Sequence, residues 1–173
     1  MTLVDFEGIS ESQYLEYALE WEASSEKIVP AASARKGRTF GELQARWRDD
    51  QTDAAYSRGF VPCTLYFLVD PRQRIVGAIH FRHTLNERLL LNGGHIGYGV
   101  RPSERGRGYA TTMLRLLLEI AERQGHERVL LTCDEENIAS QRTIEKCGGV
   151  LRDKLEYEGV WTRRYWIEKP DRA

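Results

Sequence analysis

The chain has 173 residues, which suits one domain with a sizeable core rather than two domains. Its 25 Lys and Arg residues against 26 Asp and Glu residues give a formal net charge of -1, which argues against a dedicated nucleic-acid binder because such proteins are usually strongly basic. No stretch approaches the ~18 consecutive apolar residues of a membrane span. The N-terminal residues 1–7 lack the basic and apolar regions of a signal peptide.

The cysteines are odd in number, spread out and without C-x-x-C spacing: Cys63, Cys133 and Cys147. We interpret them as reduced thiols of a cytoplasmic protein. The four histidines do not cluster with the cysteines at the spacings of metal ligands, so we expect no metal site.

The N-terminal half of the sequence predicts two helices and three strands. A strand at about 3–6 precedes a helix capped by Ser10. A loop at 27–38 leads to a second helix that begins after Thr39, with Glu42 completing a capping box, and runs to about Tyr56. Two strands at 66–69 and 75–81 are joined by a turn at 70–73, and a loop follows at 85–94.

The C-terminal half predicts four strands and two helices. A strand at 96–100 is followed by a long helix whose apolar residues recur at i, i+3, i+4 and i+7 from Ala110 to Ala121. Gly125 can end that helix. A strand at 129–133, a helix and two final strands complete the order β-α-α-β-β-β-α-β-α-β-β.

The turn between the strand at 96–100 and the long helix is the strongest functional signal. Gly106 and Gly108 allow the backbone to approach a ligand because they carry no Cβ. The helix that follows offers unpaired N–H groups and the positive end of its dipole. Together these features predict a cradle for a pyrophosphate.

The turn does not match the two commonest nucleotide-binding motifs. The Gly-Lys-Ser or Gly-Lys-Thr of a P-loop is missing, and Thr111 stands where the dinucleotide-binding fingerprint has its third glycine. A nucleotide-binding module is therefore disfavoured.

Two blocks carry a resemblance to a known family. The turn resembles motif A of the GNAT superfamily of N-acetyltransferases, R/Q-x-x-G-x-G/A; aligning Gly106 and Gly108 with its two glycines puts Ser103 where Arg or Gln is usual. The segment from Asn137 to Gly149, with Ser140 and a Glu-Lys-x-Gly ending, resembles motif B of the same superfamily. The resemblance covers about 95–149 and is greatest for the branch that acetylates N-terminal amines of ribosomal proteins.

The resemblance implies a fold, a reaction and partners. The fold is α+β in three layers: a single domain over 1–173, with a mixed, mostly antiparallel sheet of six or seven strands flanked by four helices. The reaction is acetyl transfer from acetyl-CoA, as co-substrate, to an amine of a small molecule or peptide by direct attack in a ternary complex. No nucleic acid or membrane is implied, and a homodimer is left open.

The resemblance also assigns the cofactor site. Backbone N–H groups at about 105–110 would meet the pyrophosphate, two arginines would add charge, and N–H groups near 98–100 would stabilise the oxyanion. The expected cofactor-binding residues are Tyr98, Val100, Arg105, Gly106, Arg107, Gly108, Tyr109, Ala110, Asn137 and Ser140. Asn137 has an equally good explanation as a helix N-cap.

The catalytic residues are less clearly marked. His95 stands where many relatives have Glu, and a histidine pKa near about 6.5 suits a general base; a structural histidine at a strand end is the alternative. Other candidates for the base are Glu87, His80, His83, Asp134 or water. Ile144 occupies the usual position of a proton-donating tyrosine, so Ser140 or water would protonate the thiolate.

The missing tyrosine also fits a catalytically silent acyl-CoA-binding domain, which is the main alternative function. The acceptor pocket is expected between the segments 10–56 and 85–94, with Trp21, Trp47 and Glu87 as lining residues.

Overall fold

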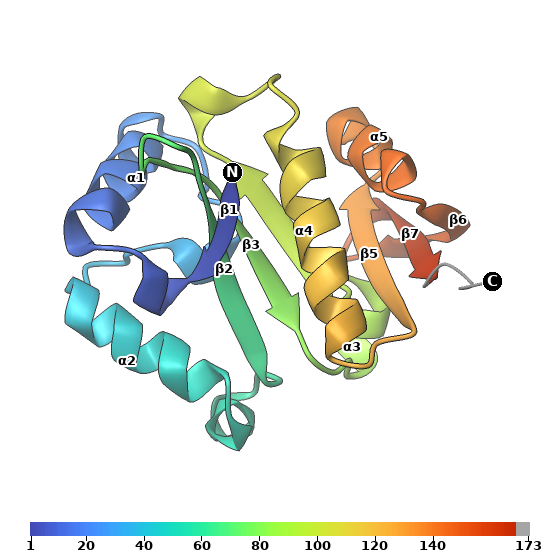
Figure 1. Ribbon diagram of the computed structural model, residues 1–173. Coiled ribbons are helices and arrows are strands. Elements are labelled where there is room, and N and C mark those ends of the chain that lie inside the picture. Colours follow the sequence, from blue (N-terminus) through green and yellow to red (C-terminus); the bar gives the residue numbers. More distant parts are fainter. Residues whose placement is uncertain (169–173) are drawn as a thin grey trace.

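The computed structural model describes residues 1–168, which form one seven-stranded sheet between two layers of helices (Figure 1). The strand order is β1-β2-β3-β4-β5-β7-β6, and the β4–β5 pair is parallel whereas the other pairs are antiparallel. The strands are β1 (Thr2–Asp5), β2 (Cys63–Val69), β3 (Ile75–Arg82), β4 (Ile96–Val100), β5 (Arg128–Asp134), β6 (Val150–Tyr157) and β7 (Val160–Glu168). The predicted α+β fold with a mixed, mostly antiparallel sheet is confirmed.

The helices are α1 (Glu11–Ala23), α2 (Phe40–Asp50), α3 (Glu87–Leu91), α4 (Tyr109–Arg123) and α5 (Ile138–Lys146). Both predicted N-caps are present: Ser10 forms a capping box with Gln13, and Thr39 forms one with Glu42. None of the helices within residues 1–168 is long and apolar enough to cross a membrane.

Each face of the sheet has its own apolar core. One core is aromatic and joins α1 and α2 to β2 and β3; Tyr14 lies at its centre, with ring contacts to Phe40, Trp47 and Phe67. The other core joins α4 and α5 to the opposite face through residues such as Leu117. Because both faces of the sheet carry apolar side chains, helices cover both of its sides.

The structure differs from the sequence prediction in two connections. The segment 85–94, predicted as a loop, contains the five-residue helix α3, whose start is capped by the Asn86 side chain. Helix α2 ends at Asp50 rather than near Tyr56, because Thr52 caps a separate 3₁₀ turn over Asp53–Arg58. Neither difference affects the order of the strands.

The parallel pair β4–β5 determines where a ligand can enter the sheet. It is held by one register pair, Ile96 with Leu131. Beyond Ile96, β4 continues to Val100 without further pairing to β5, so its backbone on that side is left for another partner. Helix α4 lies across the sheet next to these strands (Figure 1).

Candidate cofactor cleft and active site

A cleft of about 780 Å³ opens where β4 is no longer paired with β5. Its walls are the end of β4, the turn that leads into α4, the start of α5 and the end of α1 with the segment that follows it. The lining residues are Trp21, Glu26, Lys27, Val29, Tyr98, Gly99, Val100, Glu104, Arg105, Gly106, Gly108, Tyr109, Ala110, Thr111, Asn137, Ala139, Ser140, Arg142, Thr143 and Lys146. The cleft thus contains all the cofactor-binding residues expected from the sequence except Arg107.

The turn before α4 has the backbone geometry of an anion site. Gly106 and Gly108 have φ angles of +77° and +80°, and a Cβ at either position would meet no protein atom within 4 Å. Gly108 is the N-cap of α4, and no side chain of the described residues caps this helix start. The first N–H groups of α4 are therefore available to a ligand, at the positive end of the helix dipole.

The structure corrects the register of motif A. The Ser103 hydroxyl donates to Glu20 of α1, and Ser103 does not line the cleft. Arg105, Gly108 and Ala110 do line it. The pattern R/Q-x-x-G-x-G/A therefore fits from Arg105 to Ala110 without any departure, and the sequence alignment that began at Ser103 was shifted by two residues.

Both arginines of the turn form ion pairs. The Arg105 guanidinium donates to both carboxylate oxygens of Glu26 at 3.1 and 2.8 Å and lies 5.2 Å from the ring centroid of Trp21. Arg107 pairs with Glu104 at 3.0 Å and does not itself line the cleft. In this arrangement the backbone, rather than either guanidinium, forms the open part of the cradle.

The start of α5 forms the opposite wall. The Asn137 side chain accepts a hydrogen bond from Ser140 N at 3.0 Å, so Asn137 is the N-cap of α5 as well as a lining residue. The Ser140 hydroxyl lies 2.9 Å from the Tyr98 hydroxyl of β4. Burial raises the pKa of Tyr98 to about 12, so this pair keeps its protons at neutral pH.

Ile144, at the position where relatives usually have a tyrosine, has no side-chain proton to donate. Ile144 is fully buried in the core between α4, α5 and the sheet. Cys133, at the end of β5, is also buried, and burial raises the pKa of its thiol to about 11. The Tyr98 and Ser140 hydroxyls are therefore the candidates for a proton donor in this part of the cleft.

His95 lies outside the cleft, immediately before the start of β4, where β4 is paired with β5. Its Nδ1 accepts a hydrogen bond from Leu130 N at 2.8 Å, and its ring is in contact with His126 and Trp166. Burial, with a further contribution from His126, lowers the pKa of His95 to about 4. These contacts favour the structural alternative over the predicted general base.

We therefore predict that His95→Ala lowers the melting temperature of the protein and leaves kcat of the folded enzyme close to that of the wild type. The substitution leaves the buried Leu130 N–H without a partner, which costs about 1–3 kcal/mol. His95→Asn, whose side-chain oxygen can accept the same hydrogen bond, should restore part of the loss. Melting temperatures and kcat values of both variants test this; an unchanged melting temperature with a ~100-fold lower kcat would return the base role to His95.

The remaining sequence candidates are mostly not in the cleft. Glu87, His80 and His83 do not line it. Trp21 and Trp47, which were expected in the acceptor pocket, both belong to the aromatic core, and Trp21 also lines the cleft. Asp134 lies beside the cleft, in a hollow of about 720 Å³ that shares Asn137 with it. Acidic side chains line this hollow, and the exposed Trp161 of β7 forms part of its wall.

Gly99 has a structural explanation that the sequence did not reveal. A Cβ on Gly99 would lie 2.1 Å from the Val29 carbonyl oxygen, so the segment after α1 approaches β4 through this glycine. This contact brings Glu26 and Lys27 to the cleft, and neither residue carries a sequence pattern that would have identified it.

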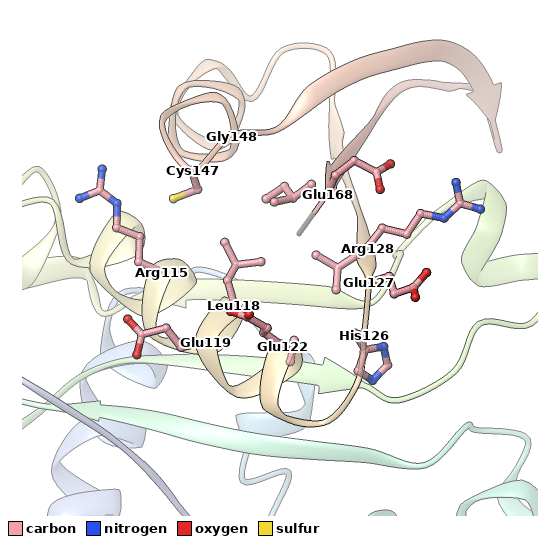
Figure 2. A pocket seen from close by; sticks show the side chains of 13 residues that line it. Arg115, Leu118, Glu119, Glu122, His126, Glu127, Arg128, Cys147, Gly148 and Glu168 are labelled. Carbon is pink, nitrogen blue, oxygen red and sulfur yellow. The ribbon is translucent and has the colours of Figure 1, made fainter. Parts of the chain in front are cut away.

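A second hollow, of about 440 Å³, lies further along α4, beside the residues that follow α5, and shares no lining residue with the cleft (Figure 2). Its floor is apolar, and its rim carries Arg115 and Arg128 together with four glutamates: Glu119, Glu122, Glu127 and Glu168. An acidic rim disfavours an anionic ligand. Among residues 1–168, no group of three or more His, Cys, Asp or Glu side chains is arranged to hold a metal ion.

Comparison with solved structures shows the same fold in several acetyltransferases. A GnaT-family acetyltransferase from Bordetella pertussis aligns with a TM-score of 0.65 at 20% identity, covering 95% of this chain and 93% of that one. A variant of the spermidine N-acetyltransferase SpeG from Vibrio cholerae aligns with a TM-score of 0.66 at 16% identity, covering 97% of this chain and 95% of that one. RimL, a ribosomal L7/L12 alpha-N-protein acetyltransferase in complex with coenzyme A, aligns with a TM-score of 0.64 at 18% identity, covering 96% of this chain and 92% of that one.

Sequence comparison gives the family. A protein from Bacillus subtilis (strain 168) described as the uncharacterized N-acetyltransferase YjdG is 30% identical over 95 residues. The match spans about half of each protein, 54% of this chain and 51% of the relative. The sequence model of the acetyltransferase (GNAT) domain family matches residues 8–150, which include all the residues that line the cleft. The chain therefore belongs to the GNAT acetyltransferase family.

Proposed function

We propose that this protein is an acetyl-CoA-dependent N-acetyltransferase. It moves an acetyl group from acetyl-CoA to a primary amine of a small molecule, a peptide N-terminus or a lysine, by direct attack in a ternary complex. The observation that carries the proposal is the uncapped start of α4, with Gly106 and Gly108 open to the cleft beside the unpaired end of β4. That cradle suits a pyrophosphate, and the unpaired β4 backbone suits the pantetheine arm.

The reaction requires an oxyanion donor, a proton donor for the thiolate and an acceptor for the proton of the amine. The amine nitrogen attacks the thioester carbonyl, whose oxygen accepts a hydrogen bond from a backbone N–H at about 98–100. The carbon–sulfur bond then breaks, and the thiolate takes a proton from the Ser140 hydroxyl, which lies 2.9 Å from the Tyr98 hydroxyl. A proton returned through water in the cleft restores the serine hydroxyl. The proton of the ammonium passes to water in the cleft, with Asp134 in the adjoining hollow as the nearest of the sequence candidates.

The hollow beside the cleft supports an amine as the acceptor. Asp134, Glu135 and Glu136 line it, and carboxylates attract an ammonium group before it loses its proton. Glu135 is already paired with Lys154 at 2.6 Å and Arg163 at 3.1 Å, so the other two carboxylates would supply most of this attraction. Spermidine and a ribosomal protein N-terminus, the acceptors named for two structural neighbours, are both amines.

We predict that acetyl-CoA stabilises the folded protein and that NAD does not. A ligand that binds only the folded state adds roughly 2.7 kcal/mol at a hundredfold excess over its dissociation constant. Thermal unfolding with each ligand measures this difference. Stabilisation by NAD alone would favour the dinucleotide-binding alternative.

Acetyl transfer itself is tested by incubating the protein with acetyl-CoA and a panel of amines. The panel should include polyamines, peptides with free N-termini and lysine peptides, with release of the thiol as the readout. Transfer to any of these amines above the rate of hydrolysis supports the proposal. Tight acetyl-CoA binding without transfer to any amine would favour a silent acyl-CoA-binding domain, which the buried Ile144 also fits.

A further inference from the structure

The Glu20 side chain of α1 contacts the chain just before the cofactor cradle. One carboxylate oxygen accepts from Ser103 N at 2.8 Å, and the other accepts from the Ser103 hydroxyl at 3.0 Å and from Arg101 Nε at 2.7 Å. The partners are more than 80 residues apart in the sequence. A single carboxylate thus joins α1 to the residues that lead into the turn.

The charge of Glu20 is required by its buried partner. Arg101 is only 2% exposed, and a guanidinium cannot lose its charge in a protein. Arg101 Nη1 also donates to the Ile75 carbonyl at 3.0 Å and pairs with Glu16 at 3.3 Å. Although burial would raise the pKa of Glu20, hydrogen bonds from Arg101 and Ser103 hold it below its usual value, so Glu20 is ionised at neutral pH.

The contact lies very near the cradle without entering it. Ser103 belongs to the 3₁₀ turn Pro102–Glu104, and the first glycine of the cradle is three residues further on, at Gly106. Arg105 N donates to the Pro102 carbonyl at 3.4 Å, which links that turn to the cradle. Glu20 does not line the cleft. Its influence on a ligand must therefore act through the position of the turn.

We propose that Glu20 is a positioning residue for the cofactor: by holding Ser103 and Arg101, it fixes the cradle against α1. The inference rests on the proposed function, because it assumes that the cradle binds the pyrophosphate of acetyl-CoA. It also explains Ser103, which fell outside the corrected motif but makes two of the hydrogen bonds to Glu20. Backbone donors bind an anion well only when their positions are fixed beforehand.

Three variants test this role by calorimetric titration with acetyl-CoA, well below each melting temperature. Glu20→Gln should weaken binding by about 10- to 100-fold, as expected when a displaced cradle loses about one charge-assisted hydrogen bond to the pyrophosphate. Ser103→Ala keeps Arg101 paired and should weaken binding by a smaller factor. Glu16→Gln is the matched control: Glu16 pairs with Arg101 and Arg74 but not with Ser103, so its affinity should stay within about twofold.

Steady-state kinetics separate positioning from a merely structural role. At saturating acetyl-CoA, Glu20→Gln should keep a kcat near that of the wild type, while its KM for acetyl-CoA rises with the dissociation constant. If Glu20→Gln does not fold, Ser103→Ala and its comparison with Glu16→Gln decide the question.

The outcomes distinguish this inference from the proposed function. A wild-type protein that binds no acetyl-CoA would overturn the proposed function. Normal affinity in Ser103→Ala and in any folded Glu20→Gln protein, with only the melting temperature lowered, would overturn the positioning role alone.

Discussion

Replacing Gly108 with valine should abolish most acetyl-CoA binding while the protein still folds. A side chain at Gly108 would project into the open space of the cleft, where the residue now has a φ of +80° and no protein atom within 4 Å of a Cβ. It would block access to the first N–H groups of α4. Hydrogen bonds to a charged group are worth about 1.5–3 kcal/mol each, so losing two should weaken binding by about 100-fold or more.

Gly125 provides a matched control for the strain that valine introduces. It has a φ of +87°, follows the other end of α4, and its Cβ would also meet no protein atom within 4 Å. Both valine variants should lose stability because a β-branched residue is strained at positive φ. Calorimetry should find weakened binding in Gly108→Val only. Equal affinities in the two variants would place the pyrophosphate elsewhere.

The sequence predicted the parts of the molecule that depend on local chemistry. Ser10 and Thr39 were recognised as N-caps because their side chains satisfy N–H groups within three residues. The cradle was recognised for the same reason, because its glycines and the following helix are contiguous in the chain. Local patterns therefore predicted the order of the strands along the chain and the backbone geometry of the glycine turn.

The parts that the sequence did not reveal depend on contacts between distant residues. His95 was expected to be a base, but the hydrogen bond from Leu130, which lies 35 residues away, occupies its Nδ1. The Arg105 pair with Glu26 spans 79 residues, and the approach of Val29 to Gly99 joins a loop to a distant strand. No spacing rule for a single helix or strand encodes such contacts.

The proposed proton donor combines a residue that a local pattern identified with a contact that only the fold reveals. Ser140 was predicted from its place in motif B, whereas Tyr98 was expected only to bind the cofactor. The fold places their hydroxyls 2.9 Å apart, although they are 42 residues apart in the sequence. Because Ile144 is buried, we propose that this pair supplies the proton that a tyrosine on α5 would otherwise donate.

Ser140→Ala should therefore lower kcat by about 100-fold or more, the usual effect of losing a general acid, with little change in acetyl-CoA affinity. Tyr98→Phe should lower kcat less, because Ser140 keeps its own proton, and the double variant should be no slower than Ser140→Ala by itself. Thr143→Ala shows the effect of removing a neighbouring hydroxyl: Thr143 lies in the same cleft on the same helix, donates to the Ala139 carbonyl at 2.9 Å and also interacts with Tyr98. Single-turnover rates for the wild type and the four variants with one accepted amine provide the measurement. If Ser140→Ala reacts as fast as the wild type, the thiolate takes its proton from water, and the Tyr98–Ser140 pair only holds α5 against β4.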